Sequence, residues 1–291
     1  MRARLLAAAA LGLVLARGGW ADDTVARGAY LTRIGGCFSC HTDAAHGGAP
    51  LAGGRALATP FGTFYSPNIT PDRATGIGGW TAAQFRRALR EGVRPDGANY
   101  FPVFPYPSFT NIRDDDLDAM FAYLQSRAPV RAPNRAHEVG FPFGWRLLQS
   151  GWKWLFFTPG PFTPSPARSA AQNRGAYLVT ALGHCGECHT PRNALGALRR
   201  DRFLAGTPDG PEGASVPNIT PDPKTGIGQW TKDDLIELLA TGNTPEQSRV
   251  KGAMREAVQD GLKDLTEADR AAIADYLLAL PPIANAVEKP Q

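Results

Sequence analysis

The sequence predicts an all-α protein in which two tandem helical domains are joined by a strap rich in aromatic residues and proline. One reason is an internal repeat: "PNITPDRATGIGGWT" at residues 67–81 returns as "PNITPDPKTGIGQWT" at 217–231, 150 residues later. A second reason is that helix signals follow each copy, whereas strand patterns are almost absent. The third is length, because 291 residues suit two domains of about 100 to 150 residues each.

Residues 1–21 have the pattern of an export signal. The stretch "MRARLLAAAALGLVLARGGWA" has a basic start, an apolar run of about a dozen residues, and small residues before Asp22. A membrane-spanning helix needs about 20 apolar residues, so a retained membrane helix is the less favoured alternative. We therefore expect a mature protein that is soluble in the periplasm, an oxidising compartment.

The charge pattern does not indicate a nucleic-acid partner. The formal net charge is +4, but the export signal contains three arginines and no acid, so its removal leaves +1. The remaining Lys and Arg residues are scattered along the chain rather than clustered in one run. We expect no nucleic-acid binding.

The four cysteines form two C-x-x-C-H motifs with none left over. The motif residues are Cys37, Cys40 and His41 in the first copy, and Cys185, Cys188 and His189 in the second. In this pattern the two thiols bind a haem through thioether bonds and the histidine binds its iron. A zinc site or a thioredoxin-like redox pair is the less favoured alternative, because the latter would need a surrounding βαβ pattern. The sequence predicts two covalently attached haem c groups, with His41 and His189 as proximal ligands.

Each copy of the repeat carries matching helix signals. Thr81 and Gln84 form a capping-box pattern for a helix that Gly92 ends, and Thr231 and Gly242 bound the matching helix. A final helix follows in each copy, with apolar residues at helical spacing. These residues are Leu117, Met120, Phe121 and Leu124 in the first copy, and Ile273, Tyr276, Leu277 and Leu280, after a cap at Thr266, in the second.

The resulting order of elements resembles the class I cytochrome c fold, twice. Each copy has a helix, the attachment motif, a long Gly/Pro loop, a middle helix, a second loop and a final helix. We place the first cytochrome c domain at residues 22–128 and the second at 171–285. Because roughly 100 residues is thin for an independent apolar core, the resemblance implies that the haem forms part of each core.

A cytochrome of this fold needs a sixth iron ligand, usually the thioether of a methionine before the last helix. Met1 belongs to the export signal, and Met120 lies on the apolar stripe of a helix, where it suits core packing. Met254, in "VKGAMREAV" on the loop before the final helix, is the candidate ligand. Subtracting the repeat offset leads to Phe104, in "FPVFPYPSF" at 101–109. We expect the first haem to lack a methionine and the second to have the higher potential.

The sixth position of the first haem is then vacant, filled by water, or bound by a substitute side chain. We favour a vacant or weakly held position slightly over His137, which is the best of a weak set. The other candidates are His46, Tyr100, Tyr106 and Lys153. His184, beside Cys185, is interpreted as a partly exposed residue near the haem edge rather than as a ligand.

The linker strap, residues 129–170, is too aromatic for a flexible linker, above all in "GFPFGWRLLQSGWKWLFFTPGPF" at 140–162. The favoured interpretation is a strap packed across both domains, which fixes their separation. The alternative is a docking face for a dehydrogenase or a membrane, because exposed aromatics at this density mark interaction sites. The residues of that face would be Trp145, Trp152, Trp154, Phe156 and Phe157.

Several segments resemble one known family. They are "GGCFSCHT", "FGTFYSPNITPD", "GIGGWT", "FPVFPYPSF", "CGECHTPRNALGA" and "SVPNITPD". Together they resemble the multihaem cytochrome c subunits that accept electrons for periplasmic alcohol, gluconate and sorbitol dehydrogenases, and the related subunits of molybdenum hydroxylases. The resemblance covers residues 24–281. Subunits of this family commonly have a methionine where Phe104 stands, three haem domains and a membrane-associating segment, whereas two attachment motifs occur here.

The resemblance implies an electron-transfer protein rather than an enzyme. We expect it to carry electrons from a periplasmic dehydrogenase of the flavin, quinoprotein or molybdenum type to an acceptor in the respiratory chain. Peripheral association with the membrane stays open. The alternative is a haem enzyme, a dihaem peroxidase or a thiosulfate-oxidising cytochrome that uses the methionine-free first haem. The sequence offers no acid or base beside Phe104, which argues against this alternative.

Overall fold

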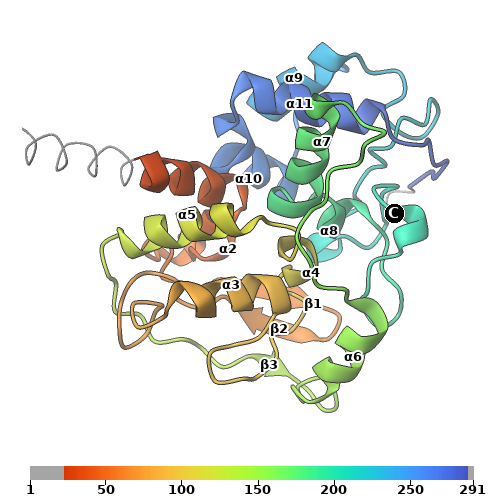
Figure 1. The fold of residues 1–291 in the computed structure, drawn as a ribbon. Helices are drawn as coiled ribbons and strands as arrows, with labels where there is room; N and C mark the ends of the chain where they lie inside the picture. The colour runs from red at the N-terminus through yellow and green to blue at the C-terminus, as the bar shows by residue number, and fades with distance from the viewer. Residues whose placement is uncertain (1–22, 288–291) are drawn as a thin grey trace, which may run out of the picture.

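The computed structural model describes residues 23–287, so the predicted export signal, residues 1–21, lies outside the described residues. The chain is mainly helical, and its two halves lie side by side (Figure 1). Residues 23–128, drawn from red to yellow, are called the first half below. Residues 170–287, drawn from green to blue, are called the second half.

The α-helices of the two halves follow the same order, and the second half has additional short 3-10 and π-helical turns. The first half has a helix over residues 23–34, then α2 (Cys37–Cys40), η1 (Ala44–His46), α3 (Ala82–Glu91), α4 (Tyr106–Phe109) and α5 (Asp114–Gln125). The second half has α7 (Ala170–Tyr177), the π-helical turn η2 (Leu178–Leu182), α8 (Gly186–His189), η3 (Arg200–Arg202), η4 (Pro211–Gly213), α9 (Lys232–Thr241), α10 (Gly252–Asp260), η5 (Leu262–Asp264) and α11 (Glu267–Leu278). The strap contributes α6 (Leu148–Phe156).

The first and last helices of each half pack against each other at a glycine. A Cβ on Gly28 would lie 1.9 Å from the carbonyl oxygen of Ala119 in α5, and a Cβ on Gly175 would lie 1.9 Å from that of Ala272 in α11. Neither position therefore accepts a side chain without moving the helices apart. The first and last helices therefore cross closely in both halves.

The predicted helix ends are confirmed for three helices. Thr81 caps α3 through a capping box with Gln84, and Thr231 caps α9 in the same way. Gly92 and Gly242 end these helices in the left-handed conformation, with φ of 63° and 79°. Thr266 caps α11, and its side chain accepts a hydrogen bond from the Asp269 amide.

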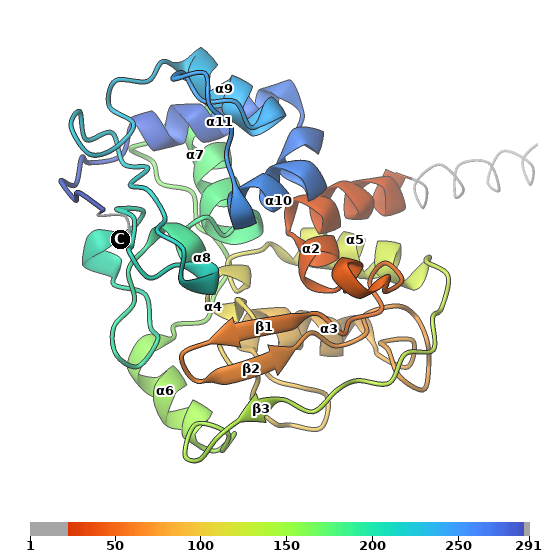
Figure 2. The same ribbon diagram turned by 180° about the vertical axis from the view of Figure 1, so that it is seen from behind.

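The prediction of an all-α fold has to be corrected, because the first half carries a small sheet. Its three antiparallel strands have the order β1 (Ala56–Thr59), β2 (Gly62–Tyr65) and β3 (Glu138–Val139). The sheet lies on the face seen in Figure 2, with β3 arriving from the strap. Strands this short give little alternating pattern, and β3 pairs with a strand more than seventy residues earlier, so local periodicity does not reveal the sheet.

The halves share one hydrophobic core. Buried side chains from both form a continuous cluster, which includes Leu31 and Leu117 from the first half and Leu178 and Ile273 from the second. The predicted domain boundaries therefore do not coincide with separate cores, and they stay a prediction.

Reciprocal hydrogen bonds also join the halves. Tyr30 of the first half donates to Asp269 of the second at 2.6 Å, and Tyr177 of the second donates to Asp116 of the first at 2.5 Å. Each carboxylate also pairs with an arginine of its own half: Asp116 with Arg27, and Asp269 with Arg174. These pairs are equivalent in the repeat, so the interface has an approximate two-fold relationship.

The strap has an inner side that contacts both halves and an outer side that is exposed. On its inner side the Trp152 indole donates to the Leu195 carbonyl of the second half at 2.9 Å, and Trp152 and Phe157 pack on Tyr106 of the first half. On its outer side Trp154 is 85% exposed. Among the described residues, no helix has the length and apolar character required to cross a bilayer.

Candidate haem-binding sites

The attachment motifs form short helices directly after the first helix of each half. Cys37 and Cys40 bound α2, and Cys185 and Cys188 lie at the start and within α8. None of these thiols is in a disulfide, and burial raises the pKa of both Cys37 and Cys185 to about 12. Within the described residues, no group of three or more His, Cys, Asp or Glu side chains is placed to hold a metal ion.

The two motif histidines are held in the same way. The His41 Nδ1 lies 2.7 Å from the Pro67 carbonyl oxygen, and the His189 Nδ1 lies 2.9 Å from that of Pro217. A hydrogen bond from Nδ1–H to a carbonyl orients the ring and leaves Nε2 as the coordinating atom, as in metal-bound histidines. Burial lowers the pKa of both imidazoles, which favours the neutral form that binds metals. The donor set therefore fits haem c in both halves.

The repeated "PNIT" sequence explains why these carbonyls are in place. The residue after each proline is a buried asparagine whose amide reaches the segment beyond the last helix. Asn68 Nδ2 donates to the Val130 carbonyl at 2.7 Å, and Asn218 Nδ2 donates to the Ile283 carbonyl at 2.8 Å. Each asparagine thus anchors the loop that carries the proline carbonyl. The sequence reasoning used this repeat only as evidence for duplication and missed its role.

Met254 lies in the first turn of α10, not on a loop as predicted, and its side chain is half-buried. Helix α10 packs beside α2, the attachment helix of the other half, as Figure 2 shows. The Arg55 guanidinium of the first half binds the Glu256 carboxylate of α10 through both nitrogens, one of them at 2.9 Å. Ser39 in α2 also lies 3.5 Å from Asp260. The helix with the candidate ligand is therefore braced by the opposite half.

Backbone hydrogen bonds support the pairing of Phe104 with Met254. The Tyr100 amide donates to the Gly92 carbonyl and the Val250 amide to the Gly242 carbonyl, so an offset of 150 residues still holds just before these positions.

Farther along, the offset is 153 residues, as the equivalent carboxylates Asp116 and Asp269 show. Even if the three extra residues fell before Met254, its counterpart would be Phe101 rather than Phe104. The first half has no methionine at either position.

Phe104 lies in a row of aromatic rings. Its ring centroid is 5.1 Å from Tyr100 and 5.7 Å from Phe109, and Phe109 is 5.3 Å from His184 of the second half. Tyr100 and Phe109 offer no carboxylate or imidazole to assist peroxide chemistry. The aromatic residues of "FPVFPYPSF" therefore form an apolar surface that extends from Phe104 to His184, next to the attachment motif of the second half.

The substitute ligands for the first haem differ in availability. His46 is exposed and its Nδ1 lies 2.8 Å from Asp43. The Lys153 ammonium donates to the Glu91 carbonyl at 2.7 Å, and burial lowers its pKa to about 8. His137 accepts a hydrogen bond from the Tyr65 amide at its Nδ1, 3.2 Å away, which leaves its Nε2 for another partner.

The tyrosine candidates are also constrained. Tyr106 is fully buried beneath the strap, and its hydroxyl has no hydrogen-bond partner. Burial raises the pKa of Tyr100 to about 12, which disfavours the phenolate that an iron ligand would need. His137 remains the most available of the set.

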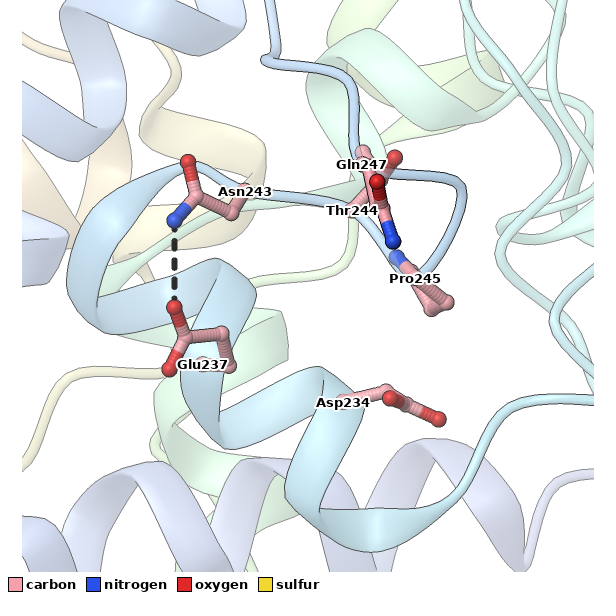
Figure 3. A pocket seen from close by; sticks show the side chains of 6 residues that line it. All are labelled: Asp234, Glu237, Asn243, Thr244, Pro245 and Gln247. Carbon is pink, nitrogen blue, oxygen red and sulfur yellow. Dashed lines mark hydrogen bonds between the residues drawn. The ribbon is translucent and has the colours of Figure 1, made fainter.

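A pocket elsewhere on the surface includes none of the predicted site residues. Figure 3 shows it between α9 and the loop that follows, where Asn243 donates to Glu237 at 3.1 Å. Its lining residues are Asp234, Glu237, Asn243, Thr244, Pro245 and Gln247. Asp234 accepts a hydrogen bond from Thr231 and Glu237 accepts one from Asn243, and the lining has no cysteine or histidine that could bind a haem.

Comparisons with known proteins agree with the geometry of the motifs. Residues 25–128 match the cytochrome c family model. The chain is 40% identical over 293 residues to a "Diheme cytochrome c-type" protein of Cereibacter sphaeroides, covering 97% of each chain. It is 44% identical over 264 residues to one of the subunits of nicotinate dehydrogenase from Pseudomonas putida, covering 90% of this chain and 22% of that one.

A third relative is the fructose dehydrogenase cytochrome subunit of Gluconobacter japonicus. The two are 42% identical over 260 residues, which is 89% of this chain and 53% of the relative. The chain thus spans about half of this relative and about a fifth of the relative from nicotinate dehydrogenase. Both relatives are named as dehydrogenase subunits.

Proposed function

The chain belongs to the family of c-type cytochromes that includes the cytochrome subunits of dehydrogenases, and on that premise we propose that it is a periplasmic dihaem electron relay. When bound, each haem iron would accept and release one electron. We place the two covalently attached haem c groups in tandem cytochrome c domains, residues 22–128 and 171–285, joined by the strap.

The observation that carries this proposal is the matched support of the two motif histidines. His41 and His189 each present Nε2 while Nδ1 is held by the carbonyl of Pro67 or Pro217. A lone C-x-x-C-H sequence can arise by chance, but two copies with the same second partner have the arrangement that an iron ligand needs. In this proposal the cysteine pairs bind the haems, the histidines bind the irons, and Met254 supplies the sulfur ligand of the second haem.

The first haem would have no methionine ligand. Phe104 closes its far side with an apolar ring, and we favour a vacant or weakly held sixth position slightly over His137. A thioether ligand stabilises ferrous iron and raises the potential. Electrons would therefore move downhill from the first haem to the second.

The electron donor we propose is a dehydrogenase of the flavin, quinoprotein or molybdenum type, and the acceptor a component of the respiratory chain. The names of the relatives support such a donor. The outer face of the strap is the proposed docking surface. All large hydrophobic side chains that are exposed in the described chain lie within residues 141–155, except Leu195, whose carbonyl binds Trp152.

This outer face suits a protein partner better than an anionic membrane. Its most exposed residues are Phe141, Trp145, Leu147, Trp154 and Leu155. The cations of the segment are turned inward: Arg146 donates to the Asn99 carbonyl and Lys153 to the Glu91 and Gly92 carbonyls. Membrane-binding helices usually expose Lys and Arg beside their apolar face, whereas interface cores are rich in aromatics and poor in lysine.

The face is also close to the proposed entry point of electrons. Lys153 and Arg146 both bond to Asn99, directly before the Tyr100 to Phe104 loop of the first half. A partner seated on the outer face of the strap would therefore lie near the first haem site.

Mass spectrometry tests the haem count. Denatured holoprotein should exceed the mature polypeptide by the mass of two haems, and Cys37→Ala with Cys40→Ala should remove one of them. A mass corresponding to one haem or none in the wild type would contradict the proposal.

Binding measurements test the docking surface. Trp154→Ser with Leu155→Ser should weaken binding to a dehydrogenase encoded beside this chain, while an exposed polar change such as Gln247→Ser should not. Co-sedimentation of the wild type with phosphatidylcholine and phosphatidylglycerol vesicles, lost in the double variant, would instead favour the membrane.

A further inference from the structure

His184 stands where the repeat calls for a glycine. The motif cysteines Cys37 and Cys185 align the two halves, so Gly36 is the counterpart of His184. Both residues have a left-handed backbone, with φ of 67° at Gly36 and 35° at His184. Glycine adopts this conformation freely, whereas a histidine does so only with backbone strain. A strained residue directly before an attachment cysteine calls for a physical reason.

The imidazole of His184 lies beside Gly36 of the other half. A Cβ built on Gly36 would lie 3.5 Å from His184 Nε2, so the ring of the second half reaches across to the first. On its other side the ring lies against Phe109, also of the first half, at a centroid distance of 5.3 Å. His184 is thus wedged between two segments of the opposite half.

The two attachment motifs lie close to each other around this ring. Gly36 and His184, which lie side by side, directly precede the first cysteines of the two motifs, Cys37 and Cys185. Ser108, next to Phe109, donates to Glu187 in the second motif at 2.6 Å. The motifs therefore meet across the interface, with His184 between them.

We propose that His184 is a positioning residue for electron transfer between the two haems, because its ring acts as a spacer that fixes the separation of the two attachment motifs. This inference rests on the proposed dihaem function. With both haems bound, the transfer would move one electron between them, with no bond made or broken and no proton moved. The rate of electron transfer falls steeply with the distance between the haems. A ring that holds the two motifs at one short separation would therefore favour fast transfer.

Three variants of the holoprotein test the spacer. His184→Gly restores the repeat residue, removes the ring and relieves the backbone strain. His184→Phe keeps a ring of similar size. Gln247→Gly is the matched control, because Gln247 is also left-handed, with φ of 55°, at an exposed turn where the first half has Gly97 with φ of 86°.

Two readouts are needed. Pulsed dipolar EPR of the oxidised protein gives the distribution of iron-to-iron distances, and flash photoreduction gives the rate of exchange between the haems. We expect a broader distance distribution and exchange slowed by about tenfold or more in His184→Gly. His184→Phe should keep the narrow distribution, and Gln247→Gly should match the wild type in both measurements.

The outcomes separate this inference from the proposed function. A wild type with fewer than two haems would overturn the dihaem function itself, and the spacer with it. In a protein with two haems, an unchanged distribution and rate in His184→Gly would overturn only the spacer role. A distribution as broad in His184→Phe as in His184→Gly would equally contradict a space-filling ring.

Discussion

In the first half, Phe104 stands where the second half has Met254, and Gly36 stands where the second half has His184. The surrounding frame is otherwise shared: both motif histidines bind a proline carbonyl, and both final helices carry a buried aspartate that binds an arginine and a tyrosine. The frame keeps the features that hold a haem, whereas the differences fall on positions that tune it. The two copies of the scaffold thus differ at the proposed sixth-ligand position and at the interface between the halves.

The largest effect is expected from changing Phe104 and Met254, the two residues that differ at the proposed sixth-ligand position. The oxidised wild type should show one thioether-to-iron absorption band, Met254→Ala should abolish it, and Phe104→Met should create a second, because only a sulfur ligand gives this band. Met120→Leu is the control and should keep the band, since Met120 is fully buried and its counterpart is Ile273. Two bands in the wild type would assign a ligand role to Met120 and contradict the pairing of Phe104 with Met254.

The reciprocal tyrosines Tyr30 and Tyr177 allow the two halves to be compared at their interface. Tyr177→Phe should lower the free energy of unfolding by about 2 kcal/mol, because it removes a hydrogen bond to a buried carboxylate. Tyr30→Phe should cost less, since its bond to Asp269 is only partly buried. Urea denaturation of the holoprotein measures both. Equal losses of unfolding free energy, or a larger loss for Tyr30→Phe, would show that burial does not determine how much each hydrogen bond contributes.

The threonine caps test whether the halves are equivalent where their local sequence agrees. Thr81→Ala and Thr231→Ala each remove a side chain that completes a capping box, so each should cost about 1 kcal/mol. The comparison is again by urea denaturation, with Thr163→Ala, an exposed position of the strap outside any helix, as the control. A clear difference between the two cap variants would mean that the middle helices do not contribute equally to stability.

The smallest expected effect is a difference in acid sensitivity. Burial opposes ionisation of Asp269, but hydrogen bonds from Arg174 and Tyr30 outweigh it and lower the pKa of this carboxyl. A lowered folded-state pKa contributes stability that is present above the unfolded value of about 4 and is lost as pH falls through the folded value. Tyr30→Phe should therefore reduce the advantage of pH 7 over pH 3 in unfolding free energy. If the stability difference between pH 7 and pH 3 is the same in Tyr30→Phe as in the wild type, the Tyr30 hydrogen bond is not the source of this pH dependence.

Features that depend on near neighbours were predictable. The C-x-x-C-H motifs, the threonine caps of α3, α9 and α11, and the membership of the cytochrome c family all follow from short stretches, and the caps and the family are confirmed. The identity of the ligand residues stays a prediction. The pairing of Phe104 with Met254 also follows from the sequence alone, because it needs only the repeat offset of 150 residues.

Features that depend on distant partners were missed. Met254 lies on a helix because α10 packs on the opposite half through Arg55 and Glu256, which are 201 residues apart. Likewise β3 extends the sheet only because the strap returns to β2. The local sequence around each element gives no sign of these partners.

Two matching C-x-x-C-H motifs, and the difference between Phe104 and Met254, follow from the sequence alone, because such motifs and the helix caps act over a few residues. Only the tertiary structure decided how the sites meet. Tyr30 reaches Asp269 across 239 residues of chain, and His184 enters the space beside Gly36 because the halves pack about a common core. Such contacts arise from the burial of apolar surface over the whole molecule, which no short stretch of sequence specifies.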